Sequence, residues 1–310
     1  MLLHPFFLYT ETMSIPVLDL EALTSRDQNE IDNLNNALRD HGFFSISNHS
    51  IDQNFLEEIY SLSEDFFNLS ETTKNKYAFP ENGGARGYTP FGKETALGEN
   101  IADLKEFWHH GPKIDQHFDT RIHKNISVKE IDHFSSRLEA LFSELNQLGI
   151  TVLDAIAYIL DKEKDFFKPW VEYGNSVLRL IHYPPVSSDE NLMRARPHED
   201  INLITLLVGA KEPGLEVLDK SGNWIKVPPS NKNIVCNIGD MMQLVTRDQL
   251  KSTTHRVMDY QEKNPKSRYS IPFFLHPSPN VTLESIVDDS PESISAHDFL
   301  EERIRAIGLY

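Results

Sequence analysis

The chain has 310 residues, of which 39% are hydrophobic, enough for one large domain or for a catalytic core with a helical extension. Its formal net charge of −17 argues against a nucleic-acid partner, because Lys and Arg side chains supply most of the affinity for phosphates. No apolar run reaches the length of a membrane-spanning helix. We therefore expect no nucleic acid, no membrane and no obligatory protein partner.

Two features bear on cellular location. The single cysteine, Cys236, cannot form a disulfide within the chain, and its apolar neighbours predict a buried thiol in a reducing compartment. Residues 1–12 include an apolar cluster but lack the basic stretch and the small-residue cleavage site of a signal peptide. We expect a cytoplasmic protein that starts at Met13, with residues 1–12 as an upstream extension.

Residues 13–125 are expected to form an N-terminal α/β region. A helical stripe begins at Ile31, Gly42 ends it, and a strand follows. Asp52 is placed to cap a second helix. Residues 80–98 are rich in glycine and proline, which predicts a loop of the kind that often carries binding residues.

A long helix is expected in a supporting segment, residues 126–172. Ser127 and Glu130 match a capping box, and apolar residues continue at helical spacing to Ile159. Such a stripe could join a coiled-coil dimer, but its apolar face is wide, so we favour burial against the protein's own sheet. Near the chain end, residues 286–310 are predicted to carry a C-terminal helix.

From residue 177 onward the pattern changes to short β-type runs separated by turns. Eight runs predict a mainly β fold with flanking helices, whose core, residues 173–285, is a double-stranded β-helix (jelly roll, cupin-like). Such folds bind ligands in the mouth between their sheets. The expected runs are 177–183, 198–208, 215–218, 224–227, 234–238, 241–245, 252–257 and 268–275.

Candidate metal ligands lie in two of these runs. On a strand, His198 and Asp200 would point to the same face, and His255 on a later strand can add a second imidazole. Two His and one carboxylate form the donor set of non-haem Fe(II) oxygenases and leave three coordination positions open. A lone His-x-Asp is more often a surface hydrogen bond, so the interpretation depends on the three residues together.

A second pair of polar residues, Arg268 and Ser270, shares one face of a strand that its phenylalanines mark as buried. An exposed Arg-x-Ser triplet is ordinarily just an edge-strand feature. A buried arginine, however, needs an anion, and a guanidinium with a hydroxyl could hold a carboxylate.

These motifs stand in the order found in a known family. They are LRLIHYPP (178–185), the His198–Asp200 pair, NIGD (237–240), KSTTHRV (251–257) and Arg268-x-Ser270. With family-like segments near the N-terminus, the chain resembles 2-oxoglutarate- and Fe(II)-dependent dioxygenases of the isopenicillin N synthase-like family, from about residue 13 to 279.

The resemblance implies that Fe(II) is held by His198, Asp200 and His255. It also implies that 2-oxoglutarate is held by Arg268, Ser270 and Tyr183. Oxidative decarboxylation of 2-oxoglutarate with O2 would then drive hydroxylation, desaturation or cyclisation of a small organic substrate. Two alternatives stay open: an Fe(II) oxidase of the isopenicillin N synthase type that does without 2-oxoglutarate, and a non-catalytic metal-binding jelly roll.

Substrate-contacting candidates are less defined. Arg86 and Tyr88 lie in the glycine-rich loop, Arg179 is a second cation, and Phe274 would shield the iron. Cations beside aromatic walls favour a small organic acid with an apolar body. Arg86 could equally be a solvated loop residue. The adjacent histidines at 109 and 110 would face opposite sides of a strand, so we do not expect them to bind one metal; lining the pocket mouth is an alternative role for them.

Overall fold

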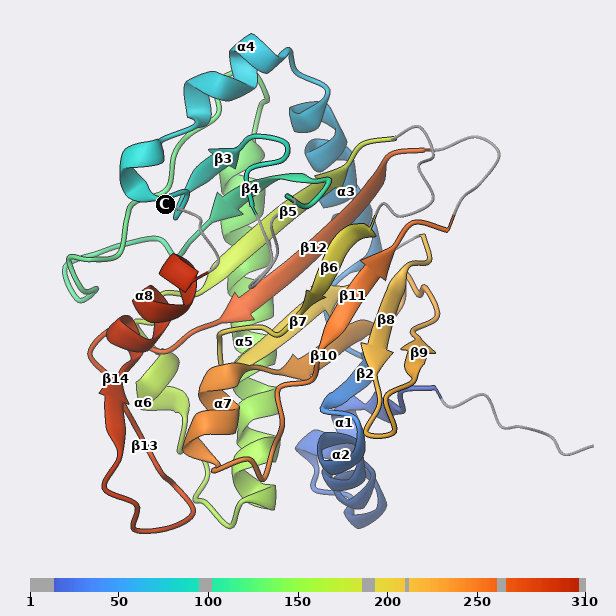
Figure 1. Ribbon diagram of the computed structural model, residues 1–310, viewed down its shortest axis with the longest axis vertical. Coiled ribbons are helices and arrows are strands. Elements are labelled where there is room, and N and C mark those ends of the chain that lie inside the picture. Colours follow the sequence, from blue (N-terminus) through green and yellow to red (C-terminus); the bar gives the residue numbers. More distant parts are fainter. Residues whose placement is uncertain (1–13, 95–101, 186–192, 210–211, 261–265, 307–310) are drawn as a thin grey trace, which may run out of the picture.

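The computed structural model describes residues 14–94, 102–185, 193–209, 212–260 and 266–306, so the expected extension at 1–12 lies outside the described residues (Figure 1). The strands are β1 (Val17–Asp19), β2 (Phe43–Ser47), β3 (Gly87–Thr89), β4 (Glu106–His110), β5 (Val177–Tyr183), β6 (Met193–His198), β7 (Ile204–Val208), β8 (Leu215–Leu218), β9 (Trp224–Lys226), β10 (Ile234–Ile238), β11 (His255–Met258), β12 (Arg268–Leu275), β13 (Thr282–Glu284) and β14 (Ser293–Ser295). The helices are α1 (Leu20–Thr24), α2 (Gln28–Asp40), α3 (Gln53–Phe67), α4 (Glu71–Lys74), α5 (Phe134–Ile159), α6 (Lys168–Val171), α7 (Asp240–Val245) and α8 (Ala296–Ala306), with 3-10 turns at Asn75–Tyr77 and Pro80–Asn82.

Two sheets form the core, as predicted for a double-stranded β-helix. The major sheet has eight strands in the order β1-β2-β10-β7-β12-β5-β4-β3, and the minor sheet has four in the order β6-β11-β8-β9. All pairings are antiparallel except that of β1 with β2. Figure 1 shows the minor sheet in front of the major one. A ligand can therefore enter between the two sheets.

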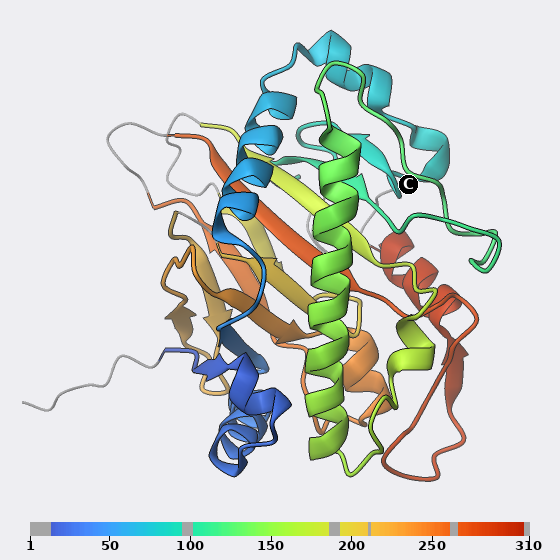
Figure 2. The same cartoon turned by 180° about the vertical axis from the view of Figure 1, so that it is seen from behind.

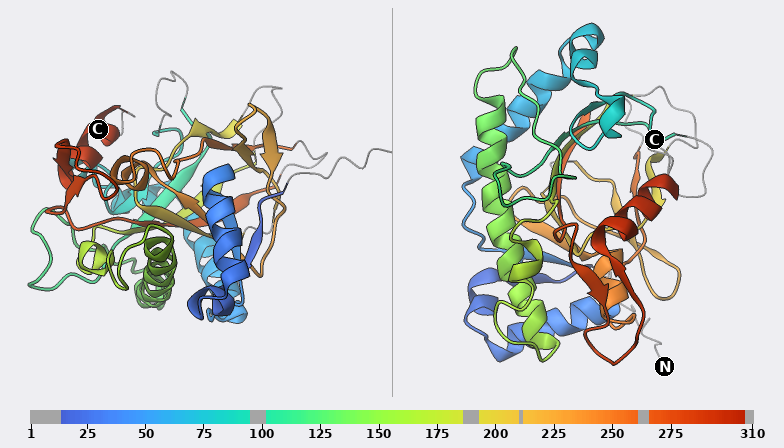
Figure 3. Two further views of the ribbon diagram at one scale, coloured as in Figure 1. Left: turned by 90° about the horizontal axis from the view of Figure 1, so that it is seen from below. Right: turned by 90° about the vertical axis from the view of Figure 1, so that its left-hand side faces the viewer.

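Helices cover the opposite face of the major sheet (Figure 2). The apolar stripe of α5 is buried there against β4, β5, β7 and β12, as predicted. Gly149 permits this close approach, because a Cβ at that position would come within 2.8 Å of Leu275 on β12. The C-terminal helix α8 lies on the other side of the sheet from α5 (Figure 3). Helix α5 thus covers one face of the major sheet, and α8 lies on the opposite side (Figure 3).

Several local predictions are confirmed, and others are wrong. Asp52 caps α3, and Gly42 follows α2 with a φ of +64°. The capping box at Ser127 does not start a helix: α5 begins at Phe134, while Glu130 accepts a hydrogen bond from Tyr77. The run 241–245 is helix α7 and not a strand; Met241, Met242 and Val245 are buried, at the spacing of one helical face.

No helix in the described ranges is both long and apolar enough to cross a bilayer.

Candidate metal centre and active-site cavity

Two histidines meet where the strands of the minor sheet end. His198 is the last residue of β6, His255 is the first of β11, and the two are paired directly across the ladder. Their ring centroids lie 4.3 Å apart. Asp200 follows in the connection to β7. One donor atom from each of these three side chains lies within 4.8 Å of the others. The cluster is the one that the sequence singled out.

Asp200 reaches this cluster for a different reason from the one predicted. The expected single strand 198–208 is wrong: β6 ends at His198 in the minor sheet, and β7 begins at Ile204 in the major sheet. Hydrogen bonds orient the carboxylate instead. Its Oδ2 accepts from Thr205 Oγ1 at 2.6 Å and from Asn237 Nδ2 at 2.7 Å. Its Oδ1 lies 4.0 Å from Nε2 of His255.

Backbone carbonyls set the tautomer of both imidazoles. Nδ1 of His198 donates to the carbonyl of Arg196 at 2.7 Å, and Nδ1 of His255 donates to the carbonyl of Thr253 at 3.2 Å. Each ring therefore keeps its Nε2 lone pair for a ligand, and such hydrogen bonds are how proteins prepare a metal-binding histidine. The ring of His255 also packs edge-on against Phe43, with centroids 5.3 Å apart.

The electrostatics of the cluster favour the ligating protonation states. Burial lowers the pKa of His198 to about 4, and His255 and Lys105 act in the same direction, so this imidazole is neutral at pH 7. Burial alone would raise the pKa of Asp200. The neighbouring imidazoles, together with Asn237 and Thr205, nevertheless hold that pKa below its ordinary value. Two imidazoles and one carboxylate are a donor set that fits Fe(II).

The residues expected to hold 2-oxoglutarate lie together on β5 and β12. Arg268 is paired with Tyr183 across the ladder, and its Cζ lies 5.2 Å from the centroid of the tyrosine ring. Arg268 is 2% exposed and Ser270 is 5% exposed. Nε and Nη1 of Arg268 are buried without a hydrogen-bond partner in the described part of the chain. A buried, uncompensated guanidinium beside a hydroxyl fits an anionic ligand.

A cavity of about 470 Å³ opens on His198 and Asp200. Part of its wall is apolar and comes from Phe107, Phe274 and two residues of α8, Leu300 and Ile304. The predicted place of Phe274 beside the site is thus consistent with the structure. The contribution of α8 could not be foreseen, because nothing in its sequence indicates which long-range surface it covers.

A chain of charged side chains forms another wall of the cavity. Lys105 Nζ binds Glu94 at 2.8 Å and Asp103 at 2.9 Å, while Arg179 Nη1 lies 3.3 Å from both carboxylate oxygens of Glu94. Arg179 also donates from Nε to Nε2 of His109 at 2.6 Å. Arg179 is therefore paired with a protein acid and is not the free cation that the sequence suggested.

Arg86 is a cation of the cavity that remains uncompensated. It is 1% exposed, and its hydrogen bonds go to neutral groups, the Ala85 carbonyl at 2.6 Å and Asn175 Oδ1 at 2.9 Å. No carboxylate of the described residues forms an ion pair with it. Burial lowers its pKa to about 10, so the guanidinium is still charged at pH 7. Within the described ranges, its Nε has no hydrogen-bond partner.

Tyr88, a substrate candidate from the sequence, does not line the cavity. It is 5% exposed in the main hydrophobic core, and its hydroxyl donates to Glu106. Tyr88 is two residues from Arg86 and would share its face only if β3 extended that far, whereas β3 begins at Gly87. We therefore assign Tyr88 a packing position.

The histidines at 109 and 110 differ in their surroundings. His109 lines the cavity, and its Nδ1 donates to the Gly84 carbonyl at 2.7 Å, which with the contact from Arg179 occupies both ring nitrogens. His110 is buried, with Nε2 3.2 Å from Asn125 Nδ2. Among the described residues, neither belongs to the three-residue donor cluster.

His276 is a cavity residue that the sequence reasoning missed. It follows β12 directly and lines the cavity. The expected run 268–275 stopped one residue short of it, so strand alternation alone did not point to this histidine.

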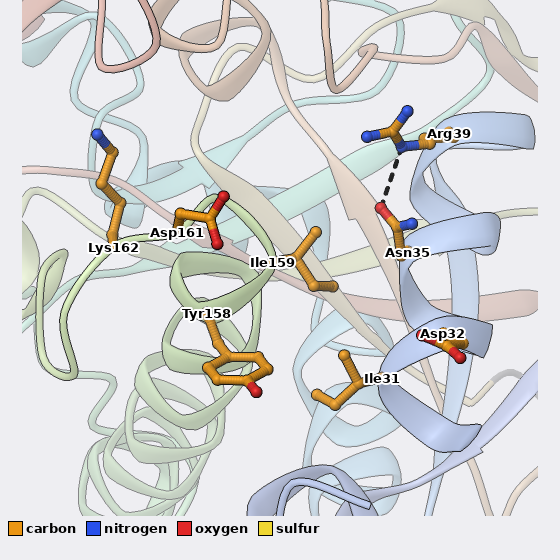
Figure 4. Close-up of a pocket in the computed structure, with 8 residues that line it drawn as sticks. All are labelled: Ile31, Asp32, Asn35, Arg39, Tyr158, Ile159, Asp161 and Lys162. Carbon is orange, nitrogen blue, oxygen red and sulfur yellow. Dashed lines mark hydrogen bonds between the residues drawn. The ribbon is translucent and has the colours of Figure 1, made fainter. Parts of the chain in front are cut away.

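A second groove, of about 490 Å³, lies between α2 and the end of α5 (Figure 4). Its lining includes Arg39, Asp161 and Lys162, and Arg39 donates from Nε to Asn35 at 3.0 Å. It contains no histidine or cysteine among the described residues, and the donor cluster lies elsewhere. We therefore place the chemistry in the cavity beside His198.

Comparisons with known proteins agree with this assignment. Residues 15–129 match the family model for the N-terminal region of non-haem dioxygenases in morphine synthesis, and residues 174–277 match the 2OG-Fe(II) oxygenase superfamily. A 2-oxoglutarate-dependent dioxygenase from Didymella fabae is 31% identical over 306 residues, which cover 91% of each chain.

Solved structures extend the likeness to the whole fold. A protein from Caulobacter crescentus, assigned to the 2OG-Fe(II) oxygenase family, is 40% identical with a TM-score of 0.86, covering 96% of this chain and 100% of that one. A full-length protein from Neurospora crassa, solved in complex with alpha-KG, is 27% identical with a TM-score of 0.86, covering 96% and 97%. That Neurospora protein has also been solved with alpha-KG and thymine together.

The chain belongs to the 2OG-Fe(II) oxygenase superfamily. It is an Fe(II)- and 2-oxoglutarate-dependent dioxygenase that uses O2 to oxidise a small substrate, as the sequence predicted.

Proposed function

We propose that His198, Asp200 and His255 hold the Fe(II) and that Arg268, Ser270 and Tyr183 hold 2-oxoglutarate. The observation that supports this most directly is the cluster of three converging side chains. A hydrogen bond orients each of them, through Nδ1 of either histidine and through Oδ2 of Asp200. The buried guanidinium of Arg268, without a hydrogen-bond partner for two of its nitrogens among the described residues, supports the second part.

Bound Fe(II) and 2-oxoglutarate supply the oxidising power, by decarboxylation of 2-oxoglutarate to succinate and CO₂ in the presence of O2. The protein's own groups hold and shield the reactants. Thr205 and Asn237 fix the Asp200 carboxylate, and Phe107 and Phe274 exclude water from the substrate side. We propose hydroxylation, desaturation or cyclisation as the outcome.

The substrate in this proposal is a small organic acid. Its anionic group would lie near Arg86, a cation of the cavity that has no ion-pair partner among the described residues, and its apolar body would lie against Phe274 and Leu300. We do not assign this role to Arg179, because it already forms an ion pair with Glu94. A desolvated guanidinium favours an anion over an amide of the same shape.

Two measurements test the assignment of iron and 2-oxoglutarate. Anaerobic addition of Fe(II) and 2-oxoglutarate together should give a weak visible charge-transfer band that neither gives alone. In air, succinate should form in step with substrate oxidation. Oxidation without succinate would instead favour the 2-oxoglutarate-independent oxidase, and a protein with neither band nor succinate would favour a non-catalytic metal-binding jelly roll.

We further propose that the enzyme works in the cytoplasm without nucleic acid or an obligatory protein partner. The buried lone thiol of Cys236 and the strongly acidic composition support this part. Fractionation of cells that express the full chain, followed by size analysis of the native protein, tests both points.

A further inference from the structure

His276 has no part in the proposed iron or 2-oxoglutarate sites, yet its side chain lines the cavity. The residue is 7% exposed, and its Nδ1 is buried without a hydrogen-bond partner among the described residues. Burial lowers the pKa of the ring to about 4, so the imidazole is uncharged at pH 7. The charge of Asp200 acts to raise the pKa of the His276 ring, and the charge of Arg86 acts to lower it. A buried polar group left unpaired is a position where a ligand contact is expected.

The backbone holds this imidazole in place. Ser176 Oγ accepts from the His276 backbone N–H at 3.1 Å and donates to the carbonyl of the same residue at 3.4 Å. A Cβ at Gly174 would overlap that carbonyl oxygen, so the chain approaches as closely as only glycine allows. The ring is therefore positioned by its backbone, while its Nδ1 has no hydrogen-bond partner among the described residues.

Strand β12 relates His276 to the rest of the site. Alternate residues of a strand face the same side, which places 268, 270 and 274 in one row, and His276 follows directly after the strand ends at Leu275. Phe274 is paired with Thr205, the residue that binds Asp200. His276 lies two residues beyond that pair, at most roughly 7 Å farther along the chain. Because Phe274 and His276 both line the cavity, we take the direction from Arg268 to His276 to run from the proposed 2-oxoglutarate site, past Asp200, toward the substrate.

Arg86 and Asn175 complete the same end of the cavity. Arg86 Nη2 donates to Asn175 Oδ1 at 2.9 Å, and the Asn175 backbone N–H donates to the carbonyl of Pro277, the neighbour of His276, at 3.2 Å. Gly111 packs directly on the guanidinium, where a Cβ would overlap it. We call Arg86, Asn175 and His276 the polar recess.

We propose that the polar recess binds the carboxylate of a compact substrate and that His276 is a specificity-determining residue within it. Arg86 supplies the charge, and the uncharged imidazole supplies one directed hydrogen bond. The short step between Phe274 and His276 allows only a few bonds between that carboxylate and the oxidised carbon. This inference rests on the proposed function, because the iron level defines the oxidised carbon.

Binding to the full chain loaded with Mn(II) and N-oxalylglycine tests the proposal by calorimetry. The probes are benzoate, phenylacetate and 3-phenylpropionate, each with its amide, and thymine as a neutral imide. At least one acid should bind about tenfold more tightly than its amide, which corresponds to about 1.4 kcal/mol. Equal binding of every acid and its amide, no binding of any acid, or thymine binding more tightly than all three acids would overturn it.

Variants then separate the residues. Arg86→Gln should abolish the preference for acid over amide, and Arg86→Lys should retain part of it. His276→Phe should weaken acid binding about five- to tenfold, whereas His276→Asn, which keeps a donor, should weaken it less. His297→Asn, at a histidine of α8 on another wall, is the matched control and should leave the preference unchanged. An unchanged preference in His276→Phe would exclude His276 from this role.

The anaerobic visible band distinguishes this inference from the proposed function. If Fe(II) and 2-oxoglutarate give the band but no acid is preferred, the polar recess is wrongly assigned and the proposed iron site stands. Without the band, the proposed function itself fails.

Discussion

Arg303 Nη2 lies 3.5 Å from Oδ2 of Asp240, so an ion pair joins α8 to the first residue of α7 beside the cavity. Both residues line the cavity, together with Leu300 and Ile304 of the same helix. The Arg303 side chain is 43% exposed, and solvent screening limits such a pair to less than about 1 kcal/mol. Its effect should therefore be local to α8.

Arg303→Gln is predicted to loosen α8 without unfolding the protein. Hydrogen exchange in residues 296–306 should become up to about fivefold faster, and about 0.5 M salt should produce a similar increase in the wild type. Arg305→Gln is the matched control, because Arg305 pairs with Glu301 within the helix and not with α7. A cooperative loss of the whole fold in Arg303→Gln would contradict this view.

The hydrogen bond from Thr205 to Asp200 should matter for iron binding. Thr205→Val removes a donor from Oδ2 and frees the carboxylate to rotate, so the affinity for Fe(II) should fall about 10- to 100-fold. Anaerobic titration with Fe(II) measures this. Thr254→Val, which removes a hydroxyl bonded to Glu199 instead, should leave the affinity near that of the wild type. Equal affinities in all three proteins would refute the assigned role of Thr205.

Replacement of Arg268 should act on 2-oxoglutarate and not on iron. Arg268→Ala is predicted to raise the KM for 2-oxoglutarate by an amount equivalent to about 2–4 kcal/mol, since a desolvated charge-assisted pair is lost. Arg268→Lys should be intermediate, because it keeps the charge but loses the fork. The measurement is succinate formation against 2-oxoglutarate concentration. An unchanged KM in Arg268→Ala would mean that another group holds the cosubstrate.

Glu94 should make stability depend on pH on the acid side. Burial opposes its ionisation, but Arg179 and Lys105 hold its pKa well below the ordinary value of 4.5. The folded protein therefore binds this proton less readily than the unfolded chain, so the stabilisation is present above about pH 4.5 and decreases as the pH falls. Glu94→Gln should lower Tm most at pH 7, and the difference from wild type should shrink toward pH 3. A constant difference would contradict the assignment.

Gly174 should tolerate no side chain. Gly174→Ala places a Cβ against the His276 carbonyl, a backbone atom that cannot rotate away, so we expect a loss of about 1–3 kcal/mol or more in the free energy of unfolding. Denaturant unfolding measures it. The variant should also disturb acid binding at the polar recess, whereas a stable variant with normal binding would show that the segment is more adaptable than the contacts indicate.

Local sequence patterns predicted most elements, because helix caps and strand alternation are local properties. Asp52, Gly42 and the strand that carries Arg268 are examples. Local patterns failed where tertiary contacts decide the structure. The apolar residues after Asp200 continue the β-type pattern, yet the chain changes sheets between His198 and Ile204. The capping box at Ser127 is matched in sequence, but Glu130 instead accepts a hydrogen bond from Tyr77.

The candidate site was predicted in its residue types more than in its geometry. His198, Asp200 and His255 could be named because their spacing and flanks are distinctive. The sequence could not show which of Arg86 and Arg179 forms an ion pair, because the partner, Glu94, lies 85 positions from Arg179 in the chain. The aromatic ring of Tyr88 gave no sign that it packs in the core. Ion pairs between residues that are distant in the chain form only in the folded protein, so no periodic pattern in the sequence predicts them.

Side chains along β12 and directly after it would bind the cosubstrate at one end and the substrate at the other. In the proposed assignment, Arg268 and Ser270 bind the cosubstrate, while Phe274 and the residue directly after the strand, His276, contact the substrate; β12 itself is held by ladders to β5 and β7. Descendants of this chain could therefore exchange the last two positions and acquire a new substrate while inheriting the same oxidant. Evolution of specificity would then need no change in the backbone, because the positions that differ and the positions that stay are neighbours on one strand.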